Sequence, residues 1–76
     1  MEVVEKVKVL GRGNVIIVDP CNYDCNFIVG DHVNIHDTEF GVSGVEIAPF
    51  TNKIGLVLYP NDKVSKIEIG DKVYKV

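Results

Sequence analysis

The sequence predicts an all-β fold, a small six-stranded β-barrel, and three observations support this prediction. The apolar residues are dominated by fourteen Val and eight Ile, against three Leu, one Ala and one Met. β-Branched side chains have a restricted χ1 and pack well on a pleated surface, while apolar residues that favour helices are scarce. Short apolar segments are separated by Gly and Pro along the chain, and one short motif occurs twice. A helical bundle is therefore excluded.

Size and composition indicate one folded domain. The chain has 76 residues, is 46% hydrophobic and 25% charged, and has a net charge of −3. It is too apolar and too weakly charged to be a disordered tail, and it has room for one core, so we expect a single β-barrel domain over residues 1–76. No apolar run is long enough for a membrane span and no signal peptide is evident, so we expect no membrane contact and a cytoplasmic location. The absence of glutamine is consistent with a thermophile source.

Six segments have the alternation or the β-branched composition of strands. These segments are Val3–Leu10, Val15–Val18, His32–His36, Phe40–Ala48, Ile54–Tyr59 and Lys72–Val76. In the first segment, Val7 and Val9 alternate with Lys6 and Lys8, which predicts a half-buried strand with the valines on its buried face. Alternation likewise points Val33 and Ile35 inward. No segment predicts a helix.

Turn-forming residues separate these segments. Gly11 and Gly13 interrupt the chain after the first strand, Pro20 and Cys21–Asn26 form a polar loop, and Pro60–Lys63 is typical of a turn. Two glycines within Phe40–Ala48 indicate a bulge or strong curvature. Six short strands in so small a chain close most economically into a barrel, because an open sheet would leave exposed edges.

An internal repeat supports two equivalent corners of one barrel. Residues Phe27–Val33 read F-I-V-G-D-H-V, and residues Ile67–Val73 read I-E-I-G-D-K-V. In each copy, an apolar residue lies three positions before Gly-Asp. A strand whose second residue is Val follows the Gly-Asp pair. The glycine can adopt the positive φ of a turn and the aspartate side chain can accept hydrogen bonds from nearby amides, so each copy can start a strand in a fixed register.

The order of these motifs resembles the second, β-barrel domain of translational GTPases of the elongation factor Tu type. The matching segments, in order, are Gly11-Arg12-Gly13-Asn14-Val15, Phe27–Val33, Ser43-Gly44-Val45-Glu46-Ile47, Ile54–Leu58 and Ile67–Val73. The resemblance covers nearly the whole chain. It implies a six-stranded Greek-key barrel of the translation-protein or reductase-isomerase-elongation factor common domain type.

Departures from that family limit what the resemblance implies about function. The chain has no Gly-x-x-x-x-Gly-Lys-[Ser/Thr] loop, so we expect no nucleotide binding and no GTPase activity. The loop Ala48–Lys53, around which the family holds part of the aminoacyl-tRNA end, is considerably shorter here than in the family. The resemblance therefore implies a free-standing, non-enzymatic binding module, with RNA or a translation or ribosomal protein as its partner.

Arg12 and Phe50 are the predicted ligand- or RNA-binding residues. Arg12, the only Arg, stands between two glycines, where low backbone crowding lets a guanidinium bind a phosphate or carboxylate bidentately. Phe50 follows Pro49 in a loop and can stack on a base or on a partner side chain. The net charge of −3 argues against broad non-specific binding to nucleic acid, but it permits a small basic spot.

Cys21 and Cys25 are close enough in sequence for a disulfide that closes a small loop, with two free thiols or a redox-active pair as alternatives. Together with His32 and His36 they resemble a zinc-binding spacing. However, two histidines four residues apart on a strand are separated by roughly 13 Å, too far to bind one ion. We expect no metal and no cofactor.

The polar residues around the third strand are candidates for acid-base chemistry, but a solvated outer face explains them better, because no nucleophile such as a Ser beside a His is implied. These residues are Asp31, His32, His36, Asp37 and Glu39. We expect no catalytic residue. Two other functions remain open: a structural or oligomer-forming barrel that pairs through Val3–Leu10 or Lys72–Val76, and a small cysteine-based redox or metal protein. The protein is expected to be a monomer or a weak homo-oligomer.

Overall fold

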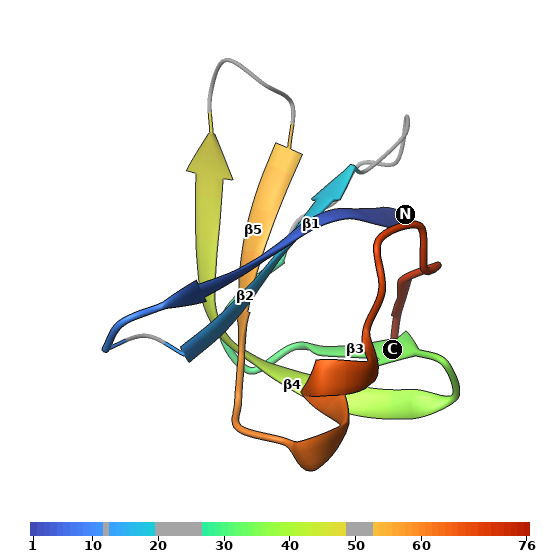
Figure 1. The fold of residues 1–76 in the computed structure, drawn as a ribbon. Coiled ribbons are helices and arrows are strands. Elements are labelled where there is room, and N and C mark those ends of the chain that lie inside the picture. Colours follow the sequence, from blue (N-terminus) through green and yellow to red (C-terminus); the bar gives the residue numbers. More distant parts are fainter. Residues whose placement is uncertain (12, 20–26, 49–52) are drawn as a thin grey trace.

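The computed structural model describes residues 1–11, 13–19, 27–48 and 53–76 (Figure 1). Six strands are present: β1 (Glu2–Val9), β2 (Gly13–Asp19), β3 (His32–Ile35), β4 (Thr38–Ala48), β5 (Lys53–Leu58) and β6 (Tyr74–Lys75). The described residues contain no α-helix, and a single 3₁₀ turn, η1 (Asp62–Lys66), follows β5. The all-β prediction is confirmed, and the predicted strands all occur. The prediction of no helix missed η1, which extends the expected turn at Pro60–Lys63.

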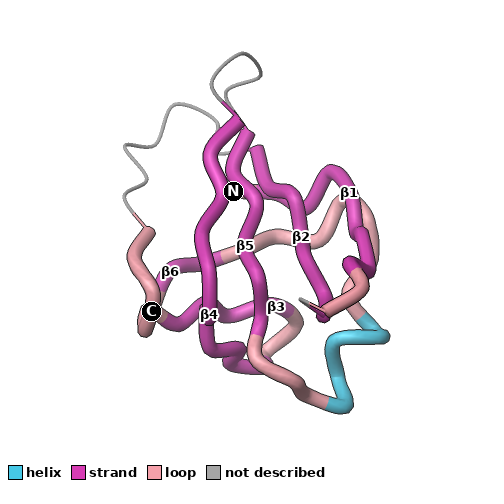
Figure 2. Tube along the Cα trace, turned by 90° about the vertical axis from the view of Figure 1, so that its left-hand side faces the viewer, coloured by secondary structure: helices cyan, strands magenta, loops and turns pink. Residues whose placement is uncertain are grey.

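The six strands form one antiparallel sheet in the order β1-β2-β5-β4-β3-β6, and Figure 2 shows β1, β2, β5 and β4 side by side. The two ends of this order also contact each other, because Glu2 of β1 makes an antiparallel β-bridge with Lys72, just before β6. Val73 N–H donates to Met1 O at 3.0 Å in the same place. Figure 1 accordingly shows the first and last segments of the chain side by side.

The two halves of the chain repeat the same strand irregularity. The register of β1 on β2 shifts between Val3 and Glu5, and the register of β4 on β5 shifts between Val42 and Gly44. The bulge predicted from the glycines of β4 is thus confirmed, whereas the bulge of β1 contains no glycine. A bulge bends its strand and increases the local twist. In Figure 1, β4 bends so that its first part runs beside β3 and its second part beside β5.

The two Gly-Asp motifs form equivalent corners. In the first corner, residues 27–31, Gly30 has a φ of 100° and Asp31 Oδ2 accepts a hydrogen bond from Ile28 N–H at 2.9 Å. In the second corner, residues 67–71, Gly70 has a φ of 96° and Asp71 Oδ2 accepts from the Glu68 N–H at 2.7 Å. The predicted equivalence of the two motifs is confirmed.

Each corner is hydrogen-bonded to the bulged strand of the other half. Gly30 N–H donates to Val42 O at 3.0 Å, and Val42 N–H donates to the carbonyl oxygen of Asp31 at 2.8 Å. In the second corner, Gly70 N–H donates to Val3 O at 2.7 Å, and Val3 N–H in turn donates to the Asp71 carbonyl at 2.9 Å. The corners therefore satisfy backbone groups that the bulges expose.

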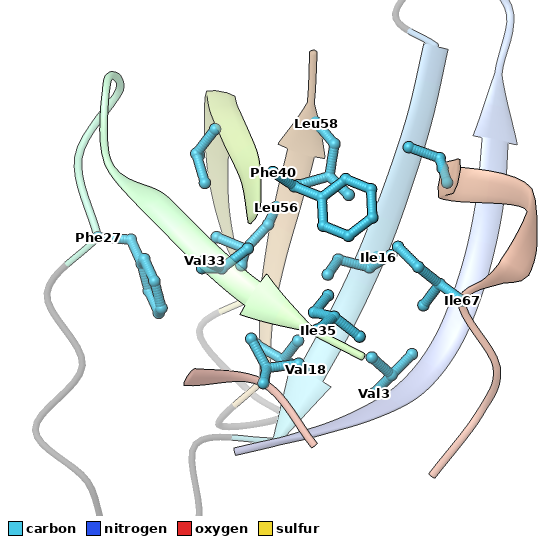
Figure 3. Close-up of a cluster of buried hydrophobic side chains, with 13 residues drawn as sticks. Val3, Ile16, Val18, Phe27, Val33, Ile35, Phe40, Leu56, Leu58 and Ile67 are labelled. Atoms are coloured by element: carbon cyan, nitrogen blue, oxygen red, sulfur yellow. The ribbon is translucent and has the colours of Figure 1, made fainter. Parts of the chain in front are cut away.

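The buried side chains form one cluster on the concave side of the sheet (Figure 3). The members are Val3, Ile16, Val18, Phe27, Val33, Ile35, Phe40, Val42, Leu56, Leu58, Val64, Ile67 and Val73. All strands except the short β6 contribute to it, and Val64 of η1 covers one end. The inward orientation predicted for Val33 and Ile35 is confirmed, because both are almost fully buried.

The burial predicted for Val7 and Val9 is wrong. Lys6 lies opposite Ile16, a core residue, so after the bulge at Val4 the lysines of β1 lie on the face of the core and the valines on the outer face. Val7 and Val9 are 37% and 36% exposed. The bulge reversed the alternation, because one extra residue exchanges the two faces of a strand.

Candidate functional site

Four lysines from the two ends of the chain lie on or beside η1, and we call Lys6, Lys8, Lys63 and Lys66 the lysine cluster. Lys6 Nζ donates to Ile67 O at 2.5 Å and lies 3.5 Å from Ser65 O, so β1 is fixed to the end of η1. Lys8 lies two residues further along the same face of β1. Lys63 and Lys66 belong to η1 itself.

The position of η1 is set by its own sequence. Asn61 is the N-cap, and its side-chain oxygen accepts a hydrogen bond from Lys63 N–H at 2.8 Å. Val64 points inward and is 3% exposed, so the turn is anchored in the core. With one side of the turn buried, Lys63 and Lys66 remain exposed to solvent.

Two hollows adjoin η1, one on each side. The first, of about 210 Å³, lies between η1 and the β1–β2 hairpin and is lined by Lys6, Val7, Lys8, Asn14, Val15, Ile16 and Val64. The second, of about 290 Å³, lies between η1 and the β3–β4 turn and is lined by Ile35, His36, Thr38, Phe40, Lys63, Lys66 and Ile67. Each hollow is lined by three or more apolar residues and by two lysines, so both favour an anionic group over a cationic one.

The lysine cluster differs from the other charged groups in its pairing. In the part of the chain that the structure describes, no carboxylate forms an ion pair with Lys8, Lys63 or Lys66. Elsewhere, Lys72 Nζ lies 3.1 Å from Glu2 Oε2, and Lys75 Nζ lies 3.3 Å from Asp31 Oδ2. Ammonium groups without a carboxylate partner are available to an external anion.

The first corner stabilises the negative charge of the Asp31 side chain. The hydrogen bond from Ile28 N–H lowers the pKa of the Asp31 carboxyl, and the nearby Lys75 ammonium adds to this effect while partial burial opposes it. A carboxylate that accepts backbone hydrogen bonds is stabilised in its charged form. The charged Asp31 side chain therefore takes part in the structure of the first corner.

The two histidines have separate partners. His32 Nδ1 lies 3.2 Å from Glu39 Oε2, and His36 Nε2 lies 2.8 Å from Asp71 Oδ1. His36 belongs to the two-residue turn between β3 and β4, in which His36 and Asp37 both have positive φ. Its bond to Asp71 connects that turn to the second corner. Among the described residues, no three His, Cys, Asp or Glu side chains converge to hold a metal ion.

Three described hydroxyl groups donate to backbone carbonyls rather than to a base. Ser43 Oγ donates to Val57 O, Ser65 Oγ to Asp62 O and Thr38 Oγ1 to His36 O. None of these three side chains therefore has the base partner of an activated nucleophile.

The site residues predicted from sequence lie outside the described part of the chain. Arg12 and Phe50, predicted to bind a ligand, and Cys21 and Cys25, predicted to be able to form a disulfide, all fall in the gaps at 12, 20–26 and 49–52. The lysine cluster was not predicted, because Lys6 and Lys8 alternate with valine as solvent-facing residues do. Only the bulge, which no glycine signals, turns them toward η1.

Comparison with protein-family models, with curated proteins and with solved structures gave no match. Within the described residues, no helix has the length and apolar character needed to cross a membrane.

Proposed function

We propose that the protein is a non-enzymatic RNA-binding module built on a closed, six-stranded Greek-key barrel like the second domain of elongation factor Tu-type GTPases. Three features support closure of the barrel: the strand order, the bridge between Glu2 and Lys72, and the hydrogen bonds that connect the second corner to Val3. Closure reduces the length of free sheet edge, which suits so small a domain.

The observation that carries the proposal is the lysine cluster. On a chain with a net charge of −3, four lysines of β1 and η1 line the two hollows beside η1, and three of them have no carboxylate partner among the described residues. RNA affinity comes largely from neutralising several phosphates at once, which a local group of lysines can do even on an acidic protein. Arg12, predicted to bind a phosphate, follows Lys8 closely in sequence.

Salt-dependent binding tests this function. We expect a short single-stranded oligoadenylate to bind at low salt, with an affinity that falls linearly with the logarithm of the salt concentration. The Lys63→Ala/Lys66→Ala variant should weaken binding and reduce the salt slope by about 1.4, since each phosphate contact on a single strand contributes about 0.7. The matched control, Lys53→Ala/Lys72→Ala, removes the same charge elsewhere and should leave most of the slope intact.

Two results would contradict RNA binding at η1. One is the absence of binding by the wild-type protein at low salt. The other is an equal loss of affinity in both double variants, which would indicate a net-charge effect without a site.

An oligomer-forming role is the second candidate, favoured by the outer edge of β1. Among the described residues, β1 pairs with a strand only on its β2 side, apart from the bridge at Glu2, and Val7 and Val9 are partly exposed nearby. Light scattering at several concentrations separates the two functions. A strict monomer that binds RNA supports the first, and a dimer that is lost in a Val7→Lys variant supports the second.

A further inference from the structure

The outer face of the β3–β4 hairpin carries two half-exposed rings on either side of a glycine. Gly41 of β4 lies opposite His32 of β3, and on its other side Tyr59 N–H donates to Gly41 O at 2.9 Å. Phe40, Val42 and Leu58, the neighbours along these strands, are buried. Alternation therefore places Tyr59, Gly41 and His32 in one row across the outer face.

Because Gly41 has no side chain, the Tyr59 ring can pack against the backbone of β4. A Cβ atom on Gly41 would lie 2.9 Å from Tyr59 Cδ2 and 3.8 Å from His32 Cε1, so the tyrosine ring packs directly against the glycine backbone. Tyr59 nevertheless remains 53% exposed. One side of the ring is thus fixed on the protein while the rest is open to solvent.

His32 is also oriented before any ligand binds. Its Nδ1 lies 3.2 Å from Glu39 Oε2, and its side chain is 51% exposed. The carboxylate of Glu39 thus helps to fix the orientation of the His32 ring on this face. Rings fixed in advance lose little conformational freedom when a ligand stacks on them.

The chain connects this face directly to the lysine cluster. Tyr59 directly follows β5, and only Pro60 and Asn61 separate it from η1, which carries Lys63 and Lys66. Aromatic side chains on an exposed sheet stack unpaired bases, and adjacent cationic groups track the backbone of the same strand. A duplex has its bases stacked internally and cannot use such rings.

We propose that Tyr59 and His32 form a stacking platform for unpaired bases, so that the RNA bound by this protein is single-stranded. The proposal rests on the proposed function, since it names the class of RNA that the lysine cluster holds. Tyr59 provides the main stacking surface, His32 extends it, and Gly41 positions Tyr59.

Substitution of Tyr59 tests the platform. Tyr59→Leu keeps an apolar side chain over Gly41 but removes the aromatic face, so it should weaken binding of single-stranded oligoadenylate by about tenfold or more. It should not change the salt slope, because the phosphate contacts remain. The conservative variant Tyr59→Phe should retain wild-type affinity. Thermal unfolding of each variant reports whether the barrel is intact.

Two further variants test the geometry. Tyr74→Leu makes the same chemical change at an exposed tyrosine that lies opposite Asn34 with no glycine beneath it, and it should leave affinity unchanged. Gly41→Ala should displace the Tyr59 ring and weaken binding, yet it should cause no further loss in the Tyr59→Leu background. This lack of additivity distinguishes positioning of Tyr59 from a general loss of stability.

The outcomes separate the platform from the proposed function. If Lys63→Ala/Lys66→Ala weakens binding but Tyr59→Leu does not, or if Tyr74→Leu has an equal effect, the platform is wrong and RNA binding at η1 stands. If single strand and duplex bind equally, the platform is also wrong. If the wild-type protein binds no RNA, both proposals fail.

Discussion

The first corner, residues 27–31, and the second, residues 67–71, have the same backbone hydrogen bonds but different surroundings. Asp31 of the first pairs with a lysine of β6, whereas Asp71 of the second pairs with His36 of the β3–β4 turn. The second corner follows η1, and the lysine cluster contacts it through Lys6 and Ile67. The fold thus repeats its corners, while the candidate site arises where the halves differ.

The glycine conformation and the aspartate cap recur because the bulged strands need the same partners in both halves. The segment before the second corner, residues 60–66, is under no such constraint. In the second half this segment contains η1, whose lysines adjoin β1 of the first half. Residues that maintain the sheet thus differ from residues that are free to bind a partner, and each corner can be tested against the other.

Removing the apolar anchor of a corner should have the largest effect. Ile67→Ala should lower the free energy of unfolding by about 2–5 kcal/mol, and Phe27→Ala by about 3–5 kcal/mol, because both side chains are buried in the shared core. Urea denaturation measures both values. A loss below about 1 kcal/mol at either position would show that this corner is not an anchor and that the halves are not equivalent.

Alanine at the corner glycines should have the next largest effect. Gly30→Ala and Gly70→Ala should each destabilise the protein by about 1–3 kcal/mol, because φ values of 100° and 96° are strained for a residue with a Cβ. Steric crowding does not cause this loss of stability, since a Cβ atom at either position would have no neighbour within 4 Å. Chemical denaturation measures the change.

The matched control for the glycines is Gly55→Ala in β5. A Cβ at Gly55 would make ordinary contacts of 3.5–3.6 Å, with no positive φ, so we expect a change within about 0.5 kcal/mol. If Gly55→Ala destabilises as much as the corner variants, backbone conformation is not the reason that the corners contain glycine.

The repeated Gly-Asp motif allowed the corners to be predicted from sequence, because a positive φ and an aspartate cap require particular residues. Strand positions were likewise set by β-branched composition. The face of the lysines in β1 could not be predicted, since the bulge at Val4 has no glycine and depends on hydrogen bonds to a corner far away in sequence. The β3–β4 turn also lacked a signal, because His36 and Asp37 occupy positions usually held by Asn and Gly.

A comparison of two lysines tests whether the cluster also stabilises the fold. Lys6→Met should cost about 1 kcal/mol, because the ammonium group of Lys6 donates to Ile67 O next to the second corner. Lys72→Met removes an exposed pair with Glu2 and should cost about 0.5 kcal/mol or less. Thermal and urea unfolding of both variants measure the difference. Equal losses would mean that Lys6 does not fix β1 to η1.

Acid titration should have the smallest effect and concerns the first corner. Because the pKa of Asp31 is lowered in the folded protein, its contribution to stability is present above the pKa of the unfolded chain and is lost as the pH falls through the folded value. Asp31→Asn keeps an oxygen that can accept from Ile28 N–H but cannot gain this contribution. We therefore expect the variant to be less stable than the wild type at neutral pH, and the difference to shrink as the solution is acidified. A difference that stays constant in urea titrations from neutral to acidic pH would show that the charge of Asp31 is not used by the corner, and that the ion pair with Lys75 is only a surface contact.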